Sequence, residues 1–267
     1  RNVLESRLYY EDGVYSIDQE DLEEKLADPQ TSMLILCNPH NPVGKIWDRE
    51  TLERIGELCF KHHVLVLSDE IHCDITRPGM EYIPFASVSE HCKNNSITCV
   101  APTKTFNLAG LQTAAVIVPD AALRHRVNRG LNTDEVAEPN VFAAIAPIAA
   151  FDRGREWLEE LREYLWENRK FAEDFIREEI PELRTVSADA TYLLWIDCNA
   201  LPGDLSELAE FIRKESGLYV CDGREYGNGY GFLRMNLACR RELLKEGLER
   251  LKRSIHSYRK GISNGII

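Results

Sequence analysis

The amino-acid sequence predicts an α/β protein with a mostly parallel sheet and flanking helices, followed by a smaller C-terminal α+β domain. Two observations lead to this class. A strand, a helix and a second strand follow one another within residues 33–67, and such a βαβ unit makes its strands parallel, with a right-handed crossover. From residue 153 onward a long charged helix precedes shorter strands and helices. We therefore expect a large domain over residues 1–152 and a small domain over residues 153–267.

Three segments make up the expected βαβ unit. Met33–Cys37 is a short apolar run that stops at Asn38, which predicts a strand buried on both faces. Asp48 then precedes a helix with apolar side chains three and four positions apart on one face. These side chains are Leu52, Ile55, Leu58 and Cys59. Val64–Leu67 is a second apolar run and predicts the neighbouring parallel strand.

Further strands and helices complete the two expected domains. Ile97–Ala101 and Ala114–Val118 predict strands on either side of a polar turn at Thr103–Gln112. Residues 153–179 carry apolar side chains on one face of a single helix, which Pro181 ends. The later expected elements are a strand at Tyr192–Asp197, a helix near Leu205–Lys214, a glycine-rich turn at Gly227–Gly231, a strand at Phe232–Leu237 and a helix near Arg241–Ile255.

Composition and charge exclude several classes of function. The 267 residues include 32 Lys and Arg against 44 Asp and Glu, so the formal net charge is −12. An acidic balance argues against binding to nucleic acid or to a membrane surface, because both need clustered basic side chains. No apolar run approaches the ~18 residues that a membrane-spanning helix needs. The opening residues also lack the pattern of a signal peptide, so we expect a cytoplasmic protein.

The cysteines and histidines do not predict a disulfide framework or a metal site. The eight cysteines are scattered without a C-x-x-C pair, and several lie in apolar runs, as reduced core cysteines do. The histidines lack the H-x-x-x-H spacing of a zinc-binding helix. We therefore expect no bound metal.

Three polar side chains follow three of the expected strands. Asn41, Asp69 and Lys104 each come shortly after a strand of the large domain, and ligands of open α/β sheets collect at the carboxyl ends of the strands. Each residue alone has an ordinary structural explanation, as part of a proline-rich turn, as a helix N-cap and as a solvated lysine. Together, an amide, a carboxylate and an amine are the groups needed to hold a heteroaromatic cation beside an amine nucleophile.

The residues around these side chains carry a specific family resemblance. Four motifs in this order resemble fold type I pyridoxal-phosphate enzymes of the class I/II aminotransferase superfamily. They are Asn-Pro-His-Asn-Pro-Val-Gly-Lys at 38–45, Ser-Asp-Glu-Ile-His at 68–72, Pro-Thr-Lys-Thr-Phe-Asn-Leu-Ala-Gly-Leu at 102–111 and Phe-Leu-Arg-Met-Asn-Leu-Ala at 232–238. Within the superfamily the sequence is most similar to the MalY/PatB branch of cystathionine β-lyases, over roughly residues 8–257.

The resemblance implies a role for each matching residue. Lys104 corresponds to the lysine that forms a Schiff base with pyridoxal 5′-phosphate and later moves protons at the substrate Cα. Asp69 corresponds to the aspartate that keeps the pyridine nitrogen protonated. Asn41 corresponds to the residue that hydrogen-bonds the 3′-oxygen of the ring. Arg234 corresponds to the arginine that binds the substrate α-carboxylate, a bidentate task for which lysine is poorly suited.

Two departures from the aminotransferase pattern bear on the reaction and on the phosphate site. His72 stands where aminotransferases commonly have tyrosine, which favours the C–S lyase branch and makes His72 a cofactor-binding candidate. Around the lysine, Ala101 and Thr103 stand where the family often has serine, and Gln112 stands where it often has arginine. Thr103 is the remaining hydroxyl that can contact the phosphate, so this chain's own phosphate contacts are expected to be few.

The resemblance implies a pyridoxal-phosphate-dependent C–S β-lyase that converts cystathionine or a cysteine conjugate to thiol, pyruvate and ammonia. A class I/II aminotransferase is the alternative, because the same residues serve both reactions. A non-catalytic fragment or a regulatory, partner-binding module on this scaffold is an alternative of another class. Family members usually act as homodimers on small amino-acid substrates. The match begins within the large domain, so about 120 N-terminal residues of the family fold are expected to be missing.

Overall fold

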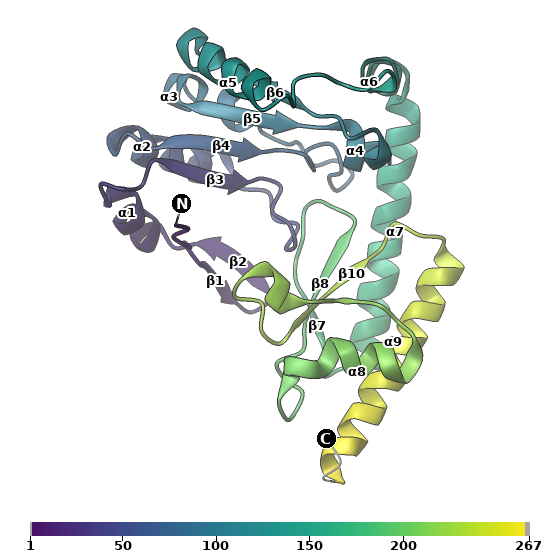
Figure 1. Ribbon diagram of the computed structural model, residues 1–267. Coiled ribbons are helices and arrows are strands. Elements are labelled where there is room, and N and C mark those ends of the chain that lie inside the picture. The colour runs from purple at the N-terminus through teal and green to yellow at the C-terminus, as the bar shows by residue number, and fades with distance from the viewer. Residues whose placement is uncertain (1, 265–267) are drawn as a thin grey trace. The chain divides into compact units, whose positions relative to one another are not determined.

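The computed structural model describes residues 2–264 of the chain (Figure 1). The chain divides into two compact units that are each built from separate segments. Unit 1 contains residues up to Leu8, Ile17–His40 and Lys45–Arg162. Unit 2 contains Tyr9–Ser16, Asn41–Gly44 and the residues from Glu163 onward. The second unit thus includes two short segments from the first part of the sequence.

Unit 1 is built on a mixed sheet with a parallel core, as the sequence predicts. Its strand order is β3-β4-β5-β6, and β3, β4 and β5 run parallel, whereas β6 pairs antiparallel with β5 (Figure 1). The strands are β3 (Met33–Cys37), β4 (Leu65–Asp69), β5 (Ser96–Val100) and β6 (Ala115–Ile117). The predicted βαβ unit is therefore confirmed, since α2 (Arg49–Lys61) connects β3 to β4.

Helices cover one face of this sheet. Asp48 caps α2 by accepting a hydrogen bond from the Thr51 backbone N–H at 2.8 Å, and Asp18 caps α1 (Gln19–Ala27) in the same manner. Apolar residues of both helices, of β3 and β4, and of α3 (Glu90–Asn94) and its approach form a single core. Its buried members are Leu22, Leu26, Leu36, Trp47, Leu52, Ile55, Leu58, Cys59, Val64, Val66, Phe85 and Cys92.

The opposite face of the sheet is exposed at its two edge strands among the described residues. Successive strand residues point to opposite faces, and Met33 and Ile35 of β3 are 38% and 70% exposed. Val116 of β6 is 40% exposed. The prediction that Met33–Cys37 is buried on both faces is therefore wrong for this chain, although the segment is a strand. An apolar run indicates burial in the whole fold, and the described residues leave this face of β3 exposed.

The remaining helices of unit 1 follow β5 and β6. They are α4 (Pro102–Thr105), α5 (Ala121–Thr133) and α6 (Phe142–Arg153), with short 3₁₀ turns η1 (Phe85–Ser87) and η2 (Ala109–Leu111). The long helix α7 (Arg155–Glu179) begins in unit 1 and continues into unit 2. Its predicted start at residue 153 falls within the end of α6, and Gly154 separates the two helices. Within the described residues, none of the helices combines the length and the apolar character that crossing a membrane requires.

Unit 2 has an antiparallel sheet of order β7-β8-β10-β9 with helices packed on it. Its elements are β7 (Arg184–Thr185), β8 (Leu193–Asp197), η3 (Leu205–Glu207), α8 (Leu208–Ser216), β9 (Cys221–Asp222), η4 (Gly223–Tyr226), β10 (Phe232–Asn236) and α9 (Arg241–Ser263). The two-stranded sheet β1 (Leu8–Glu11) and β2 (Val14–Ile17) lies largely within this unit. The α+β character of this part of the chain agrees with the prediction, but α9 extends beyond the expected end at Ile255.

The core of unit 2 is extensive and closed. It combines apolar residues of α7, β8, α8, β10 and α9, and Leu194, Ile196, Ile212 and Leu248 among them are fully buried. A second, aromatic cluster contains Trp195 and Phe232, whose rings stack at a centroid distance of 5.1 Å. This cluster includes partly buried tyrosines from the β1–β2 hairpin, which explains why Tyr9–Ser16 belongs to unit 2.

Candidate active site

Asp69 is the last residue of β4 and lies in the middle of a row across the sheet of unit 1. It is in register with Cys37 on β3 and with Cys99 on β5, so the three side chains project from the same face. Its Oδ1 accepts a hydrogen bond from the Ile71 backbone N–H at 3.3 Å. Among the described residues the Asp69 carboxylate makes no ion pair. The strand therefore ends in a half-buried carboxylate without a cationic partner.

A turn follows Asp69, so the alternative explanation as a helix N-cap is wrong. The next residue, Glu70, points into the protein and is 2% exposed. Its Oε1 accepts hydrogen bonds from the Ser68 hydroxyl at 2.9 Å and from the Phe85 backbone N–H at 3.0 Å. Burial raises the pKa of Glu70 above its ordinary value. Glu70 belongs to the same motif as Asp69, and its structural role was not predicted.

The same buried network fixes the turn that follows β3. The Tyr82 hydroxyl donates to the Asn38 carbonyl at 2.9 Å, and the Asn38 amide nitrogen donates to that hydroxyl at 3.3 Å. The Asn38 amide oxygen accepts from the Trp47 backbone N–H at 3.1 Å. Asn38 is fully buried, and both Asn38-Pro39 and Asn41-Pro42 are cis peptide bonds. This asparagine therefore holds the two ends of the turn together.

Lys104 lies in α4, directly after β5. Its side chain is partly buried, and it makes neither an ion pair nor a hydrogen bond with any described residue. Since β4 and β5 are adjacent parallel strands, Asp69 and Lys104 both lie at the carboxyl edge of this sheet. Thr103 is also partly buried next to it. The sheet thus brings an unpaired carboxylate and an unpaired amine to one edge, as the sequence predicts.

A hydrogen bond links the lysine segment to the turn after β4. Thr105, which is fully buried, donates its hydroxyl to Asp74 Oδ2 at 2.9 Å. His72 lies in the same turn and is 2% exposed, so its imidazole is packed inside unit 1. Arg162 holds the following residues by donating from Nε to the Thr76 carbonyl at 3.1 Å. These contacts between distant segments fix α4 relative to the end of β4, and they were not predicted.

The other two predicted residues meet in unit 2. Arg234 lies in the middle of β10, in register with Trp195 on β8 and with Cys221 on β9. Its Nη1 donates a hydrogen bond to Asn41 Oδ1 at 3.2 Å. Asn41 therefore does not group with Asp69 and Lys104 within unit 1, although it follows a strand of that unit. The structure divides the predicted residues between the two units, and each group is coherent by itself.

Two residues that contact Arg234 were not predicted from the sequence. Cys221 Sγ accepts a hydrogen bond from Arg234 Nη2 at 3.3 Å. The Tyr226 ring faces the guanidinium, with Cζ 4.5 Å from the ring centroid. The sequence predicts that the glycine-rich stretch Gly227–Gly231 is a turn. This turn directly precedes the strand that carries Arg234, and that position in the sequence was the signal that could have identified Tyr226. A turn that precedes a strand in an antiparallel sheet can reach the side chains of that strand.

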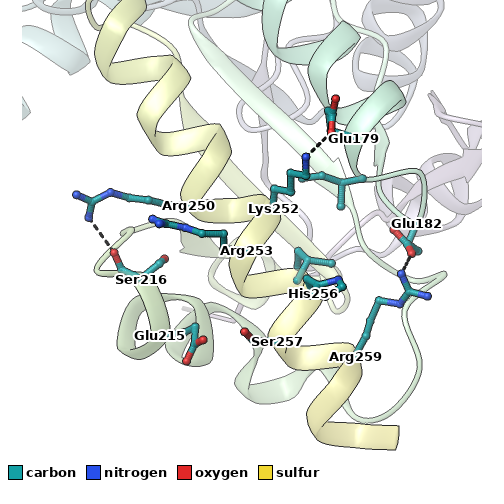
Figure 2. A pocket seen from close by; sticks show the side chains of 12 residues that line it. Glu179, Glu182, Glu215, Ser216, Arg250, Lys252, Arg253, His256, Ser257 and Arg259 are labelled. Atoms are coloured by element: carbon teal, nitrogen blue, oxygen red, sulfur yellow. Dashed lines mark hydrogen bonds and ion pairs between the residues drawn. The ribbon is translucent and has the colours of Figure 1, made fainter.

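A separate hollow of about 750 Å³ lies on unit 2, between the ends of α7, α8 and the second half of α9 (Figure 2). Its charged side chains largely neutralise one another. Lys252 pairs with Glu179 and Arg259 pairs with Glu182, while Arg250 Nη1 donates to the Ser216 carbonyl at 2.8 Å. None of the predicted site residues lines this hollow. Across residues 2–264, no three side chains of the metal-binding types form a cluster that could hold an ion.

Comparison with known proteins identifies the family. The family model for aminotransferase class I and II matches residues 4–251. The chain belongs to this family. It is 43% identical to cystathionine β-lyase PatB of Bacillus subtilis (strain 168) over 256 residues, which cover 96% of this chain and 66% of that protein. The sequence resemblance to the superfamily is thereby confirmed.

Solved structures of related proteins share the fold. Cystalysin from Treponema denticola, which contains a pyridoxal 5′-phosphate cofactor, matches with a TM-score of 0.93 and 31% identity over 97% of this chain and 66% of its own. A PLP-bound C–S lyase from Staphylococcus hominis matches with a TM-score of 0.87 and 32% identity, over 94% of this chain and 61% of its own. The chain thus spans somewhat less than two thirds of the length of these relatives.

Proposed function

We propose that the whole protein containing this chain is a pyridoxal-phosphate-dependent C–S β-lyase that acts on cystathionine or a related cysteine conjugate. The observation that carries the proposal is the pair formed by Asp69 and Lys104. An unpaired carboxylate ends β4 and an unpaired amine lies in the short helix after the adjacent parallel strand β5, at the edge where ligands of such sheets bind. The relative that is 43% identical is a cystathionine β-lyase, and this supports the lyase reaction within the family.

The chemistry of these side chains fits the cofactor that the related structures contain. A carboxylate without a cationic partner suits a protonated pyridine nitrogen, and an amine without a partner suits an aldehyde carbon. The Thr103 hydroxyl next to Lys104 can donate to a phosphate. Ala101 and Gln112, by contrast, offer no hydroxyl or cation to a phosphate. We therefore propose that residues outside this chain supply the other phosphate contacts.

Pyridoxal phosphate, when bound, supplies an electron-accepting ring for the carbanion at the substrate Cα. Lys104 would remove the proton from Cα and give it to the departing sulfur. The Asp69 carboxylate would accept a hydrogen bond from the ring nitrogen and favour its protonated form. Asn41 would hydrogen-bond the 3′-oxygen of the ring, and its amide oxygen accepts from Arg234. His72, which is buried in the turn after Asp69, is the further cofactor-binding residue of this proposal.

Arg234 binds the α-carboxylate of the substrate through paired N–H donors. Its guanidinium is held on β10 by Asn41 and Cys221 at 3.2 and 3.3 Å, so it is oriented before the substrate arrives. Such preorganisation lowers the entropic cost of binding. The substrate's thioether sulfur leaves as a thiol, and the remaining three-carbon product is hydrolysed to pyruvate and ammonia.

Product analysis with cystathionine tests the proposal. The purified whole protein with added pyridoxal phosphate should release equal amounts of thiol and pyruvate, together with ammonia. The thiol can be measured with a disulfide reagent and the pyruvate with lactate dehydrogenase. A 2-oxo acid that retains its sulfur side chain, formed with an amino acid from an added 2-oxo acid, would contradict the lyase reaction.

The second candidate is an aminotransferase that exchanges an amino group between an amino acid and a 2-oxo acid. The family model that matches residues 4–251 describes aminotransferases, and this favours the alternative. Lys104, Asp69, Asn41 and Arg234 would have the same roles in either reaction. The product analysis above distinguishes the two, because only transamination keeps the carbon–sulfur bond.

We also propose that the whole protein is a cytoplasmic homodimer. The helix α6 supports assembly, because Phe142, Ile145 and Ile148 are 65%, 67% and 61% exposed. They recur three positions apart and form an apolar stripe along the helix, and contiguous apolar surface of this kind marks an interaction site. The mass of the protein in solution, measured by light scattering, distinguishes one copy from two.

A further inference from the structure

The guanidinium of Arg234 is held by three contacts within unit 2. Nη1 donates to Asn41 Oδ1 at 3.2 Å, Nη2 donates to Cys221 Sγ at 3.3 Å, and the Tyr226 ring lies 4.5 Å from Cζ. A guanidinium has five N–H donors in one plane. The two hydrogen bonds occupy one donor on each terminal nitrogen, while the aromatic ring interacts through the cation rather than through an N–H. Donors therefore remain for a carboxylate.

Tyr226 lies in a loop that polar contacts hold on both sides. Before it in the sequence, Arg224 forms a forked contact with Asp222, from Nε at 3.0 and 3.1 Å and from Nη2 at 2.7 Å. The same guanidinium donates to the Ser206 carbonyl. The carboxylate of Asp222 also accepts from the Arg224 backbone N–H at 2.8 Å. This side of the loop is thereby fixed to the segment that begins α8.

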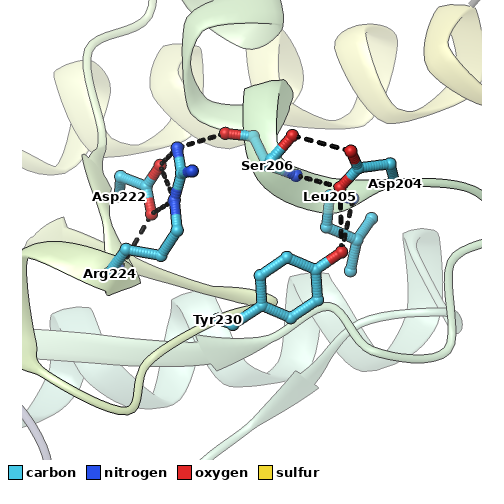
Figure 3. Close-up of polar contacts among 6 residues, drawn as sticks. All are labelled: Asp204, Leu205, Ser206, Asp222, Arg224 and Tyr230. Atoms are coloured by element: carbon cyan, nitrogen blue, oxygen red, sulfur yellow. Dashed lines mark hydrogen bonds and ion pairs between the residues drawn. The ribbon is translucent and has the colours of Figure 1, made fainter.

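After Tyr226 in the sequence, Tyr230 fixes the loop to the same segment. Its hydroxyl donates to Asp204 Oδ1 at 3.0 Å and accepts from the Leu205 backbone N–H at 3.1 Å. Figure 3 shows that Arg224 and Tyr230 both point toward residues 204–206. A side chain that lies between two such contacts has little freedom to move away. The loop therefore holds the backbone of Tyr226 in place, and the Tyr226 ring contacts Trp195 edge to face at a centroid distance of 5.9 Å.

The backbone of this loop also leaves no room for a side chain at positions 223 and 229. A Cβ added to Gly229 would collide with the carbonyl of Gly223, and one added to Gly223 would collide with that of Gly229. Gly231 has a φ of +76° and lies against the Asn199 side chain. The two ends of the loop are therefore packed backbone to backbone, which only glycine permits. The geometry of Tyr226 follows from the local sequence rather than from a chance rotamer.

We propose that Tyr226 is a positioning residue for Arg234: its ring orients the guanidinium plane so that the free N–H pair receives the α-carboxylate of the amino-acid substrate. This inference rests on the proposed function, because it assigns Arg234 to carboxylate binding. Tyr226 itself contacts no substrate in this role. Cation–π attraction acts on the face of the guanidinium, so it restricts rotation without using the donors that the carboxylate needs.

A pair of ligands that differ only in the carboxylate tests the proposal. L-Methionine has no leaving group at Cβ, and 3-(methylthio)propylamine is the same molecule without its carboxylate. The dissociation constants of both for the cofactor-loaded whole protein can be measured from the change in its visible spectrum. The wild-type protein should prefer L-methionine. Tyr226→Leu should reduce that preference roughly two- to thirtyfold, whereas Tyr226→Phe, which keeps the ring, should retain it.

3-(Methylthio)propylamine is an internal control. Damage to the fold weakens the binding of both ligands and leaves the ratio of their dissociation constants unchanged. An unchanged ratio in Tyr226→Leu, or an equal loss in Tyr226→Phe, would overturn the role of the ring. If wild type itself shows no preference for L-methionine, carboxylate binding by Arg234 fails, and with it the proposed function of that residue. If Tyr226→Leu does not fold, phenylalanine with an increasing number of fluorine atoms can be placed at position 226, which keeps the shape of the ring. Fluorine weakens cation–π attraction, so the preference for L-methionine should then decrease stepwise.

Discussion

Unit 2 encloses its core, whereas unit 1 leaves one face of its strand β3 exposed. Ile196 on β8 of unit 2 is fully buried, but Ile35 on β3 of unit 1 is 70% exposed. Both side chains lie within strands and have the same shape. Parallel sheets normally have both faces covered, and apolar surface of this kind is typical of a contact with further protein. The difference indicates that unit 2 is stabilised from within, while unit 1 presents a surface for additional packing.

The same two regions divide the proposed chemistry. Unit 1 carries Asp69 at the end of β4 and Lys104 in the helix after β5, and unit 2 carries Arg234 on a strand with its guanidinium already held. The proposal therefore assigns proton transfer and the ring nitrogen to unit 1, and the ring oxygen and the substrate carboxylate to Asn41 and Arg234 of unit 2. Substitutions in the two units should accordingly change different measured quantities.

The largest effect is expected from Arg234→Ala. Removing a charge that is bound by a carboxylate costs about 2–5 kcal/mol, so kcat/KM for cystathionine should fall roughly 30- to 5,000-fold. Arg234→Lys should recover only part of this loss, because an ammonium cannot form the paired contact. Steady-state kinetics of the whole enzyme measures both variants.

Arg213 offers a matched control in the same unit. Its Cζ lies 5.6 Å from the centroid of the Tyr219 ring, so it has an aromatic neighbour like Arg234 but no predicted role. Arg213→Ala should leave kcat/KM close to that of wild type. Equal losses in the two alanine variants would mean that Arg234 acts through stability and not through the substrate.

A comparable effect, on stability, separates the two sheets directly. Ile196→Ala should lower the free energy of unfolding by about 2–5 kcal/mol, because it leaves a cavity in a closed core. Ile35→Ala should change it by less than about 0.5 kcal/mol, as exposed substitutions usually do. Urea denaturation of both variants measures the difference. A large loss for Ile35→Ala in the whole protein would show that this side chain is covered there.

The smallest effect concerns the pH dependence of unit 1. Burial raises the pKa of Glu70 above its ordinary value of 4.5. At pH values below 4.5 the carboxyl is protonated in both states, and as the pH rises the unfolded chain ionises first, which favours unfolding. Glu70→Gln removes this ionisation. The free energy of unfolding of the variant, relative to that of wild type, should therefore increase from pH 4 toward neutral pH.

Urea denaturation of wild type and of Glu70→Gln at several pH values tests that sign. The glutamine keeps an oxygen to accept from Ser68 and from the Phe85 backbone N–H, so the packing should be preserved. A stability difference that stays constant with pH would mean that Glu70 ionises in the folded protein as easily as in the unfolded chain.

Local patterns explain which features could be predicted. The strands around Ile35 and Val66 follow from short apolar runs, and α2 follows from the spacing of apolar residues after Asp48. Lys104, Asp69, Asn41 and Arg234 follow from motifs, because their chemistry depends on residue type and order. The sheet class and the mostly parallel strand order are confirmed, and the domain boundary at residues 152/153 and the roles of these side chains stay predictions.

Contacts between distant segments explain what could not be predicted. The bond from Thr105 to Asp74 joins residues 31 positions apart, and the ring of Tyr226 reaches Arg234 only because a loop folds back over β10. The exposure of Ile35 depends on what covers the sheet, which an apolar run cannot reveal. Asn41 belongs to unit 2 although it follows a strand of unit 1, because its side chain accepts a hydrogen bond from Arg234.

The absorbance spectrum of the Lys104→Ala variant tests the central claim most directly. The whole protein with added pyridoxal phosphate should show a visible band from the lysine-bound cofactor that survives gel filtration. Lys93→Ala, which changes an exposed lysine paired with Glu90, should keep that band. Lys104→Ala should lose it together with activity. A band of unchanged position and intensity in Lys104→Ala would contradict the assignment of Lys104 as the amine of the site.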